Sequence, residues 1–66
     1  MNIQKLLDEH CIILVKSKVK LLQQNLDYCI LKNNYKSFFE ELYYNEPVIG
    51  ISRYRLLISE LKQLIK

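Results

Sequence analysis

Apolar residues recur at helical spacing through the first half of the chain. Between Ile3 and Lys32 the sequence contains neither glycine nor proline. The recurring apolar positions are Ile3, Leu7, Cys11, Leu14, Leu21 or Leu22, Leu26 and Cys29. This spacing, about 3.6 residues per turn, predicts helix over residues 2–32. Asn2 is suited to cap its start, and Asn33 is suited to end it because asparagine tolerates the left-handed conformation of a helix terminus.

The sequence leaves open whether residues 2–32 form one helix or two. The segment is long for a single helix in so small a protein, and Ser17 could cap a second helix that begins at Lys18. The β-branched residues within 12–15 also have strand character, so a short strand is an alternative at that place.

The second half of the chain predicts one short helix and a turn. Over residues 35–44, aromatic and apolar side chains share one helical face, and Glu40 and Glu41 occupy the opposite face. The face consists of Tyr35, Phe38, Phe39, Leu42 and Tyr43. Residues 45–51 contain the only proline and the only glycine, and we expect them to form the main turn.

The last helix is predicted over residues 52–65. Ser52 is a suitable N-cap, and Ile51 and Leu56 are spaced to form a hydrophobic staple around it. The inward face is formed by Tyr54, Leu57, Ile58, Leu61, Leu64 and Ile65. We therefore expect a single all-α domain of three to four helices, in which a long N-terminal helix precedes a helix-turn-helix-like pair.

The small size of the chain makes the source of its stability a question. A domain of 66 residues buries only about 60% of the surface that its unfolded chain exposes. Cys11 and Cys29 have apolar neighbours and no CxxC pattern, so we expect two buried thiols and no disulfide. His10 stands among Asp8, Glu9 and Cys11, which diverge around a helix, so we expect no metal or other cofactor. Oligomerisation remains, most simply as a homodimer.

The chain has no pattern of a membrane or export segment. Acidic residues stand where a signal peptide would have its apolar region, and the longest apolar run, Cys11–Val15, is far too short to span a bilayer. We therefore expect a cytoplasmic protein. A net charge of +3 and a pI near 9.0 favour acidic partners.

The outward side of the last helix carries cations and hydroxyls and lacks a carboxylate. This stripe consists of Ser52, Arg55, Ser59, Lys62 and Lys66. Arginine binds guanine edges in a major groove, and cations bind phosphate, so the stripe predicts a surface that reads double-stranded DNA. We expect Arg53 and Arg55 to contact bases, and Tyr35 and Lys36 to hold the flanking backbone. The alternative is an ordinary solvated helix face.

The same part of the chain resembles a family. Residues Asn34 to Leu42, followed by Ile51–Arg55, are similar to the C-terminal motif of small DNA-binding accessory proteins of conjugative plasmids, the TraK-like group. In that group a Tyr-Lys/Arg-x-Ile/Phe-x-x-x-Leu helix precedes a Ser-x-Phe/Tyr-x-Arg helix. The resemblance covers residues 34–58 and implies a role near a transfer origin or a promoter.

The resemblance also implies roles for single residues. Ser52 and Arg55 would contact DNA, and Tyr54 would be a core aromatic. The chain departs from the pattern at two positions, because Asn34 stands where the group often has glycine and Leu56 where it often has a second arginine. The turn between the two predicted helices is also longer than that of a standard helix-turn-helix, which has about three or four residues.

Other function classes were weighed against DNA binding. The sequence has no catalytic triad, phosphate loop or pair of carboxylates in a pocket, so we expect no enzymatic activity. A protein-interaction module, such as a small inhibitor or adaptor, is the main alternative, because the first helix has more apolar residues than one face accommodates. The predicted dimer or partner interface consists of Leu7, Ile12, Ile13, Leu14 and Val15. An RNA binder that stacks bases on tyrosines is a third possibility.

Overall fold

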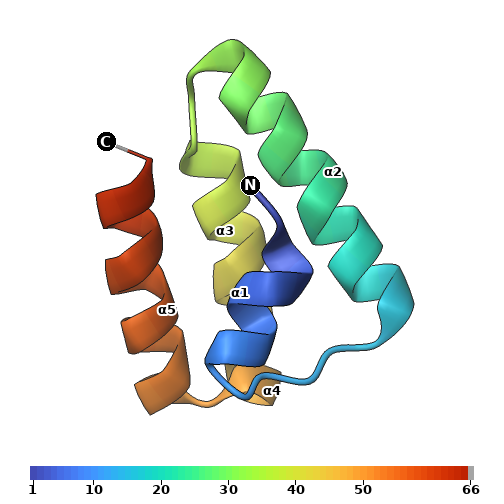
Figure 1. The fold of residues 1–66 in the computed structure, drawn as a ribbon, viewed down its shortest axis with the longest axis vertical. Coiled ribbons are helices and arrows are strands. Elements are labelled where there is room, and N and C mark those ends of the chain that lie inside the picture. Colours follow the sequence, from blue (N-terminus) through green and yellow to red (C-terminus); the bar gives the residue numbers. More distant parts are fainter. Residues whose placement is uncertain (66) are drawn as a thin grey trace.

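The chain folds as a bundle of helices in a computed structural model that describes residues 1–65 (Figure 1). Its elements are α1 (Ile3–Glu9), α2 (Lys16–Lys32), α3 (Lys36–Tyr44), α4 (Glu46–Ile49) and α5 (Ile51–Leu64). The predicted all-α class is confirmed, and residues 12–15, where a strand was an alternative, form a loop instead. Among the described residues, no helix is long and apolar enough to cross a membrane.

The long N-terminal helix of the sequence prediction is broken into two helices at Glu9. Cys11 adopts the left-handed conformation, with φ of 55°. Its N–H donates to the carbonyl of Asp8 at 3.1 Å, and the N–H of Ile12 donates to the carbonyl of Leu7 at 2.9 Å. This pair of bonds is a Schellman motif, which ends a helix by satisfying its last carbonyls.

The second helix begins differently from the prediction and ends as predicted. Val15 precedes its first residue, so Ser17 lies inside the first turn and does not cap it. At the far end Asn33 is left-handed, with φ of 53°, and the N–H of Asn34 donates to the carbonyl of Cys29 at 3.1 Å. The start of α1 also follows the prediction, because the Asn2 side chain accepts the N–H of Lys5 at 3.2 Å.

The core is built from one apolar side of every helix and from Ile12 of the loop. Its buried side chains are Ile3, Leu6, Leu7, Ile12, Leu22, Leu26, Cys29, Phe38, Leu42, Ile49, Leu57 and Leu61. Figure 1 shows α1 between α2 and α5. Side-chain bonds hold it there, because Gln23 of α2 accepts the N–H of Ile3 at 2.8 Å and His10 pairs with Glu60 of α5.

The predicted turn over residues 45–51 contains a short helix, α4. Asn45 at its start is buried, and its amide donates to the carbonyl of Glu41 at 2.8 Å. Gly50, with φ of 93°, precedes the first residue of α5, so the prediction of Ser52 as N-cap is wrong. The hydrophobic staple is not formed either, because Ile51 and Leu56 are both largely exposed.

The chain passes along α3, through α4, and returns along α5 in the opposite direction (Figure 1). Contacts near both ends confirm this pairing. The rings of Tyr43 and Tyr54 lie 6.4 Å apart, and Lys62 lies 6.0 Å from the ring of Phe39. In a standard helix-turn-helix a turn of about three or four residues joins the two helices, whereas here the short helix α4 stands between α3 and α5.

Candidate nucleic-acid interface

The outward side of α5 presents the polar residues that the sequence assigned to it. The four that fall within the described residues are all exposed: Ser52, Arg55, Ser59 and Lys62. Lys66 lies outside the described residues. Arg55 and Lys62 are two turns apart on one side of the helix, about 10 Å along its axis. Leu57 and Leu61 are buried on the opposite side, and this burial fixes which side of α5 faces outward.

Glu60, the one carboxylate of α5, is turned away from the cations. Its Oε2 lies 2.5 Å from Nε2 of His10, at the end of α1. The His10 side chain is only 16% exposed, so the pair lies at the α1–α5 boundary. The side of α5 that carries Arg55 and Lys62 therefore has cations and hydroxyls without a carboxylate, as the sequence spacing predicted.

Arg53 is exposed, but it also supports the fold. One guanidinium nitrogen donates to the carbonyl of Cys11 at 3.1 Å. This bond ties the first turn of α5 to the loop that follows α1. Because a guanidinium has five N–H donors, Arg53 keeps donors for other partners while it holds the loop. The structure separates it from Arg55, with which the sequence had grouped it for base contacts.

Tyr35 and Lys36 lie at the start of α3, as predicted, but in different surroundings. Tyr35 is half-buried and packs against the core, whereas Lys36 is exposed. The N–H of Lys36 donates to the Asn34 side chain at 3.2 Å, which fixes the start of the helix. Of the two residues, Lys36 is the more exposed.

An aromatic hollow lies between α3 and the start of α5. It is lined by Lys36, Phe39, Glu40, Tyr43, Tyr44 and Tyr54. Burial, and then the charges of Glu46 and of ionised Tyr43, raise the pKa of Tyr54 above its ordinary value. Tyr54 packs against the core, which agrees with the role that the resemblance implied for it.

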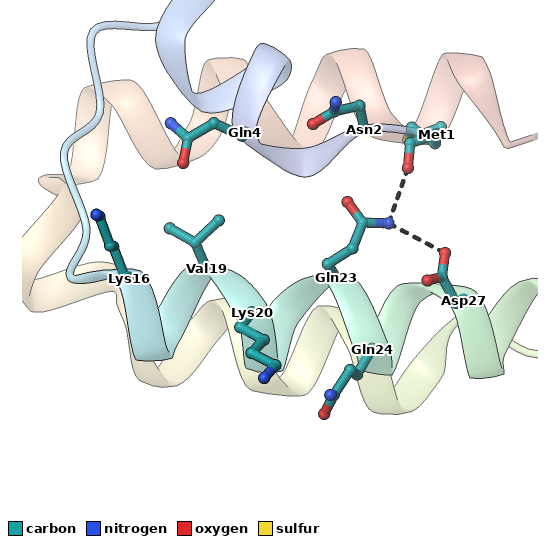
Figure 2. Close-up of a pocket in the computed structure, with 9 residues that line it drawn as sticks. All are labelled: Met1, Asn2, Gln4, Lys16, Val19, Lys20, Gln23, Gln24 and Asp27. Carbon is teal, nitrogen blue, oxygen red and sulfur yellow. Dashed lines mark hydrogen bonds between the residues drawn. The ribbon is translucent and has the colours of Figure 1, made fainter.

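A groove between α1 and α2 is larger than the aromatic hollow (Figure 2). Gln23 lies at its centre and donates to the carbonyl of Met1 at 2.9 Å and to Asp27 at 3.0 Å. Its amide oxygen accepts the N–H of Ile3. The polar groups of Gln23 are therefore used in joining the two helices, which gives this groove a structural role.

The predicted dimer or partner interface is divided by the fold. Leu7 and Ile12 are buried in the core, which corrects the prediction for these two, and Leu14 is partly buried against it. Ile13 and Val15 are 91% and 66% exposed. The Schellman motif at the end of α1 explains this division, because it directs Ile12 inward and its neighbour outward.

The two cysteines also differ from the prediction of two buried thiols. Cys29 is buried in α2, but Cys11 is exposed because the chain leaves the helix there. Within residues 1–65, no three His, Cys, Asp or Glu side chains are grouped as a metal ion would need. His10 has Glu60 as its partner instead.

An exposed apolar stripe on α2 was not predicted from the sequence. Leu21, Tyr28 and Leu31 are 47%, 58% and 78% exposed, on the side away from the core. The sequence signal for this stripe was the spacing of its residues, which are seven and then three positions apart. It was hidden because a second apolar stripe, which forms the core side, runs along the same helix.

Compared with known proteins, the chain matches no family model, no curated protein and no solved structure. Its function must therefore be argued from the chemistry of its surface. That surface offers a cationic side of α5, an aromatic hollow, and exposed apolar residues on the α1–α2 loop and on α2.

Proposed function

We propose that the chain is a small, non-catalytic DNA-binding protein whose contact surface is the outward side of α5. The observation that carries the proposal is the cationic side formed by Arg55 and Lys62, from which the pairing with His10 turns the carboxylate of Glu60 away. Such a protein would act in the cytoplasm as a plasmid- or phage-type regulator or accessory factor.

The dimensions of α5 suit this role. Its 14 residues span about 21 Å, and the major groove of B-DNA, about 12 Å wide, admits one helix. Arg55 would bond a guanine edge through two parallel N–H groups, and Lys62 would contact a phosphate. Lys36, at the start of α3, would hold the flanking backbone.

The resemblance to the TraK-like group supports the proposal at particular residues. Ser52 and Arg55, the two implied contacts, are exposed, and Tyr54 packs against the core. Leu56 is 62% exposed where the group often has arginine. In the proposed complex this leucine would lie against apolar groups such as a thymine methyl.

The test is a titration of labelled random-sequence duplex at about 50 and 200 mM salt. We expect Arg55→Ala with Lys62→Ala to lower affinity at least tenfold and to reduce the salt slope by about one, because Lys62 is the proposed phosphate contact. The matched control is Lys16→Ala with Lys18→Ala, which removes the same charge from exposed residues of α2. It should change affinity much less.

The outcomes separate specific use of α5 from general attraction by charge. Equal losses in the two double variants would mean that net charge, and not the side of α5, drives binding. If the wild-type protein does not bind duplex at low salt, the DNA-binding proposal is abandoned. Circular dichroism of each variant shows whether its helices are retained.

A protein-interaction module is the second candidate function. The observation that favours it is the loop between α1 and α2, where Ile13 is 91% exposed and Val15 66%. Because Ile13 is almost fully exposed, Ile13→Asp should keep the fold. Under this hypothesis Ile13→Asp abolishes partner binding, while Arg55→Ala is without effect. Under the DNA hypothesis Arg55→Ala lowers DNA affinity, while Ile13→Asp leaves it unchanged.

A further inference from the structure

The outer side of α2 has the residue pattern of a coiled-coil seam. Leu21, Tyr28 and Leu31 are exposed there, and Ser17 and Gln24 complete a stripe whose steps alternate between four and three residues. This alternation is the spacing by which two helices pack in a coiled coil. Figure 1 shows α2 at the edge of the bundle, so a second molecule could reach its outer side.

We propose that a second copy of this chain covers the stripe, with the two α2 helices parallel. In that arrangement each seam residue meets its own counterpart across a twofold axis. Leu21, Tyr28 and Leu31 then bury apolar surface against apolar surface, while the amide of Gln24 has a second amide as a partner for hydrogen bonds.

The antiparallel arrangement has two registers, and neither fits as well. The first places Gln24 against Leu21 and Tyr28 against Ser17 of the other copy, and a buried amide without a partner costs roughly 1–3 kcal/mol. The second places Leu21 against Leu31 and Gln24 against Tyr28 of the other copy.

The charges beside the seam disfavour the second register. Like flanks face each other in an antiparallel pair, which here brings Asp27 to Asp27 and Lys18 to Lys32 of the other copy. The seam and its flanks together therefore favour the parallel pair.

The charges beside the seam are complementary in the parallel pair. In a parallel coiled coil, a residue on one flank of a helix lies beside the residue that is five positions further along the second helix. Asp27 therefore lies beside Lys32 of the second copy. The twofold axis makes two such pairs. On the same flank Lys20 faces Asn25, so no like charges meet. Lys32 already lies 5.8 Å from the ring of Tyr28, next to the seam.

The contact would be short and the dimer weak. The 17 residues of α2 span about 25 Å, and two of the five seam positions are polar. We therefore expect weak association, with a dissociation constant on the order of 10–100 μM, because so short a seam buries little area. The inference does not rest on the proposed function, because the DNA contacts were placed on α5.

Sedimentation equilibrium across about 5–500 μM protein tests the dimer, a range that brackets the expected dissociation constant. The mass should rise from the monomer value of 8.0 kDa toward twice that value. Leu31→Lys should weaken association at least tenfold. Its control, Ile13→Lys, adds the same charge at a more exposed apolar residue outside the stripe and should leave association unchanged. A monomer at every concentration, or equal effects of the two variants, overturns the proposal.

Charge exchange tests the pairing beside the seam. Asp27→Lys and Lys32→Asp should each weaken the dimer, and the two together should restore it because the pair is re-formed with reversed signs. Circular dichroism must show the same helix content throughout, since Asp27 also accepts a bond from Gln23. If the double variant loses as much dimer affinity as the two single variants lose together, the pairing is contradicted.

A cross-link tests the direction of the helices. In a Cys11→Ser background, Gln24→Cys gives each copy one thiol beside the twofold axis of the parallel pair. The two thiols are then within reach of each other. Mild oxidation should then give a disulfide-linked dimer. A variant that still dimerises in the centrifuge but does not cross-link would exclude the parallel arrangement.

Discussion

Two adjacent leucines of α5 allow a direct test of the fold. Leu57 is 1% exposed and lies in the core, whereas its neighbour Leu56 is 62% exposed. Replacing either by alanine changes the helix propensity of the same helix by the same small amount. A difference in stability between the variants therefore reports burial alone.

The expected magnitudes differ severalfold. Leu57→Ala removes buried methyl and methylene groups and leaves a cavity, which costs about 2–5 kcal/mol. Leu56→Ala removes surface that is mostly in water already, so its cost should stay below about 1 kcal/mol. A domain of this length has a total stability of only about 3–10 kcal/mol. Leu57→Ala should therefore lose a large part of it.

Urea unfolding followed by helical circular dichroism measures both variants. We expect the midpoint of Leu57→Ala to fall by at least about 2 M and that of Leu56→Ala by less than about 1 M, for a slope near 1 kcal/mol per M. The protein concentration should be kept at a few μM, so that association does not contribute. Equal midpoints for the two variants would refute the orientation of α5, and with it the assignment of its outward side.

Two further predictions concern a helix cap and a tyrosine. Asn2→Ala removes the side-chain oxygen that accepts the N–H of Lys5 and should lower the free energy of unfolding by about 1 kcal/mol, while Asn2→Ser should retain most of it; equal losses in both would mean that the cap adds nothing. Because the folded-state pKa of Tyr54 is raised, the folded protein holds this proton above pH 10 where the unfolded chain releases it, so stability falls as pH rises through that range. Glu46→Gln should lower the Tyr54 pKa in a titration of tyrosinate absorbance, with Tyr54→Phe identifying the signal, and an unchanged pKa would exclude the charge of Glu46 as a cause.

Local sequence signals identified several features correctly. The cap at Asn2, the end of α2 at Asn33 and the inward residues Leu57 and Leu61 of α5 all agree with the structure. Each depends on chemistry within about one turn of helix or on simple periodicity. For the same reason the exposure of Arg55 and Lys62 followed from spacing alone.

Other features required contacts between distant parts of the chain. The end of α1 was missed because Cys11, which carries no sequence signal for a left-handed conformation, takes the place where glycine or asparagine is usual. The start of α5 was misplaced because Gly50 precedes it, although Ser52 is the better capping residue by composition. The left-handed Cys11 is followed by Ile12, which is buried in the core, whereas Gly50 takes a positive φ that glycine adopts without strain.

The sequence by itself determined the helical class, the inward Leu57 and Leu61 of α5 and the cationic side of that helix, since these depend on periods of three and four residues. The same periodicity placed Leu64 inward, and it is 57% exposed. Tertiary structure alone decided which apolar residues remain exposed. Ile12 and Ile13 are the same type of residue, yet Ile12 is 3% exposed and Ile13 is 91% exposed. The tertiary fold likewise paired Glu60 with His10, fifty residues away, and left Leu21, Tyr28 and Leu31 exposed. The core of so small a protein cannot hold every apolar side chain. A local sequence pattern therefore does not show which apolar residues are buried and which remain exposed.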